Sequence, residues 1–144
     1  MKPDDYRALL KRNDSGSSAT FPPGFNSEQA ILTARQLVQR LESGLGRPLS
    51  LVADFPIHDA SFHAEVNLPG NGKDESWVTV RLSNFGSLAT IINYQTMPAE
   101  ALSLVAQALK ALDYVYVPVD VLTEAYPRNT PGITTWMTRF FGYL

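Results

Sequence analysis

Hydrophobic residues in two stretches of the chain recur at steps of three and four, which is the spacing of an amphipathic helix. The first stretch begins near Asn26, and its Asn26–Gln29 spacing fits a capping box. Gly44 or Gly46, followed by Pro48, ends this helix. The second stretch runs from 98 to 112, with a proline and a glutamate in its first turn.

Between these helices the period of the pattern changes from 3.6 to 2, which predicts strands with one buried and one open face. The alternating segments are 49–57, 61–68 and 77–83, and a more buried fourth strand is expected at 88–94. Short turn-rich links join them, so consecutive strands should pair antiparallel.

The rest of the chain completes the predicted order. We expect a short strand at 115–117, a turn-rich stretch at 126–132 and a last strand in the β-branched, aromatic tail at 134–144. The order α-β-β-β-β-α-β-β predicts an α+β fold, in which an antiparallel sheet carries two helices on one face. Residues 21–144 should form this single domain.

Residues 1–20 are expected to be flexible or a short helix. Asp4 can cap a helix over residues 6–10, and the Ser/Gly-rich run at 13–18 is typical of a flexible connector. This segment has no apolar core of the kind found in secretory signals, so we expect a cytoplasmic protein.

Charge and composition narrow the possible partners. The 144 residues include 12 Lys plus Arg and 14 Asp plus Glu, and the basic residues are scattered, which argues against binding to nucleic acid. No uncharged apolar run approaches the length of a membrane span. There is no cysteine, which excludes thiolate metal ligands and cysteine nucleophiles.

Candidate chemistry centres on His58 and His63, which have Asp54, Asp59 and Glu65 nearby. A metal or acid–base site is conceivable here, but the spacing matches no usual zinc motif, and any solvated strand face contains such polar pairs. No nucleophile elbow accompanies the serines. We therefore expect no catalytic residues, no metal and no cofactor.

The open face of the predicted sheet is the better candidate for function. Trp77 is an unusual member of this polar face; it either covers the end of the sheet or contacts a partner, because Trp and Arg are frequent in interfaces. The residues that we predict to bind a protein partner are Asp54, Asp59, His63, Glu65, Trp77 and Arg81.

Three segments together resemble small bacterial proteins of uncharacterised or immunity type: 61–65, 81–86 and the tail Thr135-Trp136-Met137-Thr138-Arg139-Phe140-Phe141-Gly142-Tyr143-Leu144. The resemblance implies a cytoplasmic, non-catalytic protein that neutralises a toxin by covering it. Met137 and Gly142 stand where the pattern has a tryptophan and an acid.

A second resemblance leads to a different partner. The element order and the segment Leu45-Gly46-Arg47-Pro48-Leu49 are similar to type III secretion chaperones. These chaperones are dimers that wrap an unfolded effector segment, and they usually end in a helix, whereas this chain is predicted to end in a strand.

Overall fold

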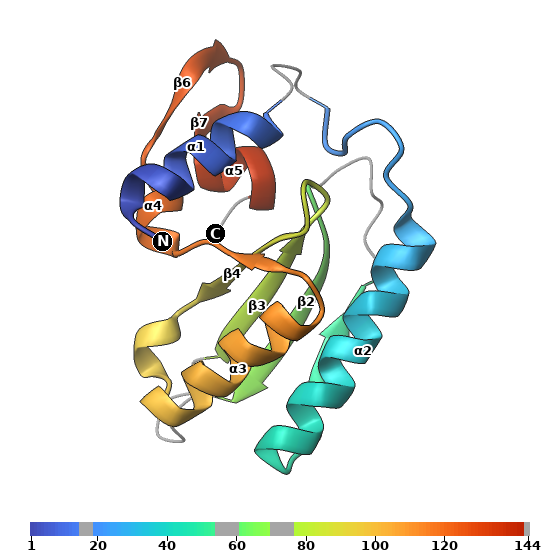
Figure 1. Ribbon diagram of the computed structural model, residues 1–144. Coiled ribbons are helices and arrows are strands. Elements are labelled where there is room, and N and C mark those ends of the chain that lie inside the picture. The colour runs from blue at the N-terminus through green and yellow to red at the C-terminus, as the bar shows by residue number, and fades with distance from the viewer. Residues whose placement is uncertain (15–18, 54–60, 70–76, 143–144) are drawn as a thin grey trace.

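A five-stranded sheet with the strand order β1-β2-β3-β4-β5 forms the centre of the molecule (Figure 1). The computed structural model describes residues 1–14, 19–53, 61–69 and 77–142. The strands are β1 (Ser50–Val52), β2 (Phe62–Pro69), β3 (Trp77–Ser83), β4 (Leu88–Ile92) and β5 (Val115–Tyr116). The first four pair antiparallel, as predicted.

The prediction of a purely antiparallel sheet is wrong, because β5 pairs parallel with β4. A helix, α3 (Ala99–Ala111), connects these two strands. Such a crossover returns the chain in the same direction, whereas a short turn reverses it. The sheet is therefore mixed, within an α+β fold that agrees with the predicted class.

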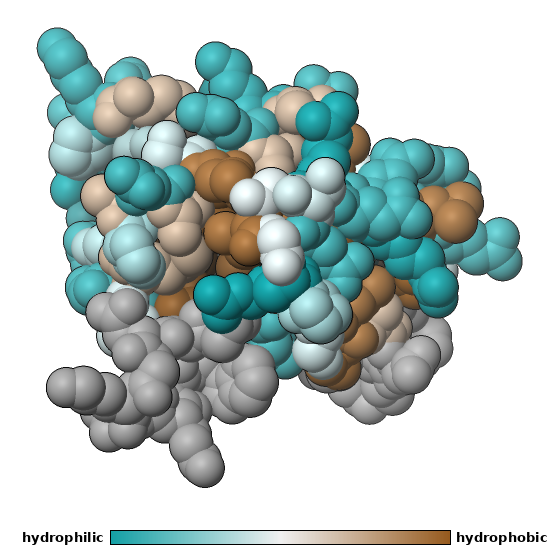
Figure 2. Space-filling view, turned by 90° about the horizontal axis from the view of Figure 1, so that it is seen from below, coloured by the Kyte–Doolittle hydropathy of each residue, from teal (hydrophilic) through white to brown (hydrophobic). Residues whose placement is uncertain are grey.

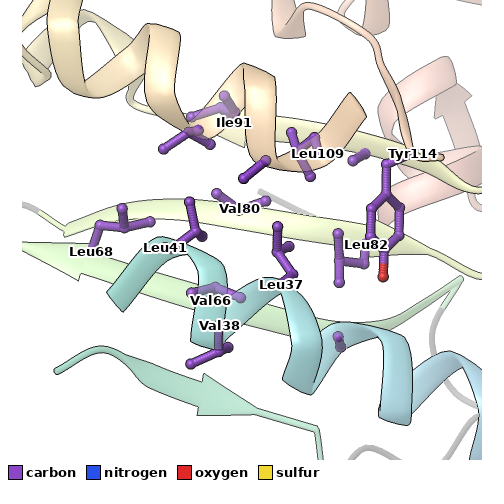
Figure 3. Packing of buried hydrophobic residues seen from close by; sticks show 14 of the residues in the cluster. Leu37, Val38, Leu41, Val66, Leu68, Val80, Leu82, Ile91, Leu109 and Tyr114 are labelled. Atoms are coloured by element: carbon purple, nitrogen blue, oxygen red, sulfur yellow. The ribbon is translucent and has the colours of Figure 1, made fainter. Parts of the chain in front are cut away.

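The two predicted helices cover one face of this sheet. Helix α2 (Ser27–Leu45) begins where the Asn26 side chain accepts a hydrogen bond from the Gln29 amide at 3.1 Å. It ends at Gly46, whose φ of 71° lies in the left-handed region that favours glycine. The core beneath α2 and α3 is aliphatic, as Figure 3 shows for Leu37, Leu41, Val66, Val80, Ile91 and Leu109.

A second hydrophobic layer with further helices, which the prediction of two helices on one face did not include, lies on the opposite face. Strand β4 shows this directly, because Ala89 and Ile91 pack into the first core while Leu88 and Ile92 pack against the second. The second layer consists of α1 (Pro3–Asn13), α4 (Val119–Leu122), α5 (Trp136–Phe141) and a hairpin of β6 (Ala125–Thr130) and β7 (Ile133–Thr135). A 3-10 turn, η1 (Tyr94–Thr96), follows β4.

The prediction of a strand over the tail is wrong for Trp136–Phe141, which form the helix α5. The Thr135 hydroxyl accepts a hydrogen bond from the Thr138 amide at 3.2 Å, which caps a helix rather than continuing a strand. Trp136 and Phe140, which are one helical turn apart in α5, stack with their ring centroids 5.7 Å apart. The turn-rich stretch before it forms the β6–β7 hairpin, which turns at Gly132 with a φ of 79°.

Buried charge ties the N-terminal segment to this second layer. Asp14 accepts hydrogen bonds from Arg139 at 3.0 Å and from the Tyr126 hydroxyl at 2.7 Å, and the Arg139 side chain is 1% exposed. Helix α1 starts at Pro3, so Asp4 is not its cap, and it buries Leu10 in the second core. The predicted connector at 15–18 lies outside the described residues.

The surface is mostly hydrophilic at the end of the molecule where α2 finishes and α3 begins. Seen from that end, hydrophobic side chains form small patches among hydrophilic ones (Figure 2). None of the helices in the described ranges combines the length and the hydrophobicity that a membrane span needs.

Candidate functional site

A β-bulge decides which way His63 faces. Phe62 pairs with Ser83 and Ala64 with Leu82, so His63 is the extra residue between two regular pairs. The bulge shifts the alternation by one residue. His63 thereby joins the α2 face of the sheet, and Phe62 faces the other side, with its ring 4.4 Å from the Arg81 guanidinium. The prediction that His63 lies with Glu65 on the open face of the sheet is therefore wrong.

The His63 ring is held by Asn84, at the end of β3. Nδ1 of His63 lies 3.2 Å from Oδ1 of Asn84, and the Asn84 amide nitrogen donates to the Thr20 carbonyl at 2.9 Å. Because the amide nitrogen is used by Thr20, the Asn84 atom that faces the ring is the oxygen, which only accepts. The proton of the neutral ring is therefore assigned to Nδ1, which leaves Nε2 as an acceptor.

Burial keeps this ring neutral. His63 is 4% exposed, and desolvation lowers its pKa below the usual 6.5, although the hydrogen bonds with Asn84 and the Ser83 backbone oppose the shift. Nε2 has no hydrogen-bond partner among the described residues. Burying an acceptor without a partner destabilises the folded state relative to leaving the acceptor in water. Native proteins rarely contain such atoms.

Tyr114 brings a second buried polar atom to the same place. Its ring lies beside Leu82 with the hydroxyl directed toward the side on which α2 lies (Figure 3). The residue is 9% exposed, burial raises the pKa of Tyr114 to about 12, and the hydroxyl has no partner within the described ranges. At neutral pH this group is a protonated hydroxyl that can donate.

His63 and Tyr114 both line a cavity of about 380 Å³ at the N-terminal end of α2. This volume is in the range of small-molecule sites. The cavity also contacts Phe25, Gln29, Thr33 and Asn84, and its described lining contains no charged residue. Phe25 forms an aromatic edge, with its ring centroid 5.7 Å from that of His63. We call this cavity the His63–Tyr114 pocket.

One wall of the pocket is the turn between β3 and β4, which has an unusual backbone. Gly86 and Ser87 both have a φ of 56°, and Ser87 is one of three non-glycine residues in the described ranges with a positive φ. A side chain at Gly86 would collide with Asn13, at the end of α1. Packing against α1 therefore holds this wall in a conformation that a non-glycine residue disfavours.

The predicted pair Glu65 and Arg81 lies away from this pocket, on the opposite face of the sheet. The two side chains form an ion pair at 2.7 Å, and they are only 18% and 10% exposed. Arg81 also donates to the Phe141 carbonyl at 2.8 Å. These contacts attach α5 to the sheet, so Arg81 has a structural role whatever else it binds.

The other predicted partner-binding residues fall at the limits of the described chain. Asp54 and Asp59 lie outside the described residues, and so does the alternative involving His58. Trp77 opens β3 opposite Pro69 in β2, and its side chain is not part of what the structure describes. In the described ranges, nowhere do three His, Asp or Glu side chains come together in a way that could hold a metal ion.

Sequence reasoning singled out His63 but missed Tyr114, Asn84 and Phe25. The three come from different parts of the chain, and only the tertiary fold brings them together. The sequence places Asn84 in one of the turn-rich links between predicted strands, and no local pattern marks Tyr114 as lacking a hydrogen-bond partner among the described residues. Compared with protein-family models, curated proteins and solved structures, the chain matches none.

Proposed function

We propose that this chain is a non-catalytic binding protein that takes a small polar ligand in the His63–Tyr114 pocket. The observation that carries the proposal is the presence of two buried polar atoms, His63 Nε2 and the Tyr114 hydroxyl, that have no partner among the described residues and belong to two residues lining one cavity. Native proteins rarely leave such atoms unsatisfied, and a bound polar group supplies the missing hydrogen bonds.

The composition of the pocket favours binding over catalysis. A general base needs a partner that orients it and a substrate group to deprotonate, and an activated nucleophile needs a base beside it. His63 is oriented by an amide rather than by a carboxylate, and Ser83 donates its hydroxyl to the Phe140 carbonyl at 2.6 Å. The polar groups of the pocket are therefore suited to recognition.

The proposal is tested by titrating isotope-labelled protein with a panel of small uncharged fragments and mapping the backbone amide shifts. We expect the shifts to cluster at Gln29, Asn84 and Tyr114. An Ala30→Trp variant, which fills the pocket, should abolish them, whereas Gln36→Trp on the exposed side of α2 should retain them. Shifts confined to other surfaces, or none at all, would refute the proposal.

A second candidate function is the toxin-neutralising role that the sequence resemblance implies, in which a cytoplasmic protein covers a protein partner. It is favoured by the edge of the sheet, where Val52 is 38% exposed beside the half-buried Glu65. A Val52→Arg variant should then fail to co-purify a toxin that the wild type retains, while Leu32→Arg on α2 retains it. Equal retention by both variants would exclude this edge.

The chaperone alternative makes a separate prediction about size. A chaperone of that type should be a dimer at micromolar concentration, which light scattering measures directly. A monomer under these conditions would exclude this reading.

A further inference from the structure

We infer that the ligand of the His63–Tyr114 pocket is uncharged and donates a hydrogen bond from an amide N–H or a hydroxyl group, rather than being an anion. This inference rests on the proposed function and specifies the class of ligand. It follows from which atoms of His63 and Tyr114 donate, which accept, and which charges the described lining lacks.

The donor requirement comes from His63. Because Asn84 fixes the ring proton on Nδ1, the atom left for a ligand is Nε2, which in the neutral ring can only accept. A carboxylate or phosphate oxygen placed there would set one lone pair against another. An amide N–H or an alcohol O–H satisfies it.

The second group, Tyr114, complements the first. Its hydroxyl can donate to a carbonyl or hydroxyl oxygen, so the two atoms without partners among the described residues call for a ligand that both donates and accepts. A primary carboxamide has both functions in one plane, and an alcohol has both on one atom. The edge formed by Phe25, close to His63, suits a flat apolar body attached to that group.

Two further observations argue against an anion. The described lining of the pocket has no Lys or Arg to neutralise one. The N-terminus of α2, which could attract negative charge, is already capped, because the Asn26 side chain accepts from the Gln29 amide. An anion would therefore lose its hydration here without gaining a cationic partner from the described lining.

Four compounds of nearly equal shape test this inference by calorimetric titration at pH 7.5. Benzamide donates and accepts, benzyl alcohol does so through a hydroxyl, acetophenone only accepts, and benzoate is an anion. We expect benzamide, benzyl alcohol or both to bind at least about tenfold more tightly than acetophenone and benzoate, the equivalent of one hydrogen bond. The stronger of the two distinguishes an amide ligand from an alcohol.

The Tyr114→Phe variant provides the matched control. It should keep the fold, as circular dichroism shows, and lower the affinity of the preferred compound about tenfold. Acetophenone or benzoate binding as tightly as benzamide and benzyl alcohol would overturn the inference while leaving the pocket a binding site. If none of the four binds but the fragment panel still maps to the pocket, the inference fails alone; if the panel also fails, the proposed function fails with it.

Discussion

At the scale of single residues, the pocket holds groups that weaken the protein when nothing is bound. The Tyr114 hydroxyl and His63 Nε2 are buried without partners among the described residues. Each such group reduces the free energy of unfolding, because water hydrogen-bonds it in the unfolded chain. Buried polar groups of this kind are expected at binding sites, where a ligand supplies the missing hydrogen bonds.

Replacing Tyr114 by Phe should therefore stabilise the free protein. The change removes a hydroxyl that has no partner among the described residues and keeps the buried ring, so we expect the free energy of unfolding to rise by about 1 kcal/mol in urea denaturation. Tyr116→Phe, at a partly buried tyrosine two residues further along the chain in β5, is the control and should change little. A loss of about 1 kcal/mol in Tyr114→Phe would show that its hydroxyl has a partner in the folded state.

His63 should make stability depend on pH in one direction. Its pKa is lowered below 6.5 in the folded state. At a pH between the folded pKa and 6.5, the unfolded chain therefore binds more protons than the folded one. Stability is then complete above pH 6.5 and falls as the pH decreases toward the folded pKa. Urea denaturation from pH 7.5 to 5.5 should show this slope in wild type and in His58→Gln, and a flatter one in His63→Gln. Equal slopes in all three would contradict burial of a neutral His63.

At the scale of elements, the regular parts of the pattern were predictable and the irregular parts were not. The periodicity identified α2, α3 and the antiparallel strands, because one face of each packs on the first core. It failed at the bulge, where one extra residue moved His63 to the other face without changing the alternation of residue types. It also failed in α5, since aromatic residues suit a buried strand and a buried helix equally.

The ion pair that joins α1 to α5 should be worth more than a surface pair. Arg139 is 1% exposed and donates to Asp14 at 3.0 Å and to the Ala19 carbonyl at 2.8 Å. Arg139→Met leaves a buried carboxylate with fewer partners, so we expect a loss of about 3 kcal/mol in thermal or urea unfolding. Arg12→Met, on the exposed side of α1, should cost less than about 0.5 kcal/mol. Similar losses in both variants would refute this account of the buried pair.

At the scale of the whole molecule, one sheet separates two cores, and the pocket lies on the α2 side of the sheet, at the N-terminal end of that helix. Its walls come from α2, from the start of β2, and from the β3–β4 turn against which α1 packs. The sequence predicted the first core and the polar character of β2. It could not predict the second layer, because no local pattern shows that residues 3–13 pack against residues 117–141.

Helix α1 should accordingly behave as part of the folded domain. Leu10 is fully buried in the second core, so Leu10→Ala should lower the free energy of unfolding by about 3 kcal/mol in a single cooperative transition. Leu32→Ala, at a leucine that is 55% exposed on α2, is the control and should cost less than about 0.5 kcal/mol. An unchanged stability in Leu10→Ala would mean that α1 is not docked in solution.

The central claim is that the His63–Tyr114 pocket binds a ligand through Nε2 of His63. The most direct test follows the imidazole ¹⁵N signals of His63 during titration with benzamide or benzyl alcohol, with His58→Gln used to assign them. In the free protein we expect the proton on Nδ1, and at saturation a change in the Nε2 signal while Nδ1 keeps its proton. Saturation of the protein with unchanged His63 signals, or a free-state proton on Nε2, would contradict the claim.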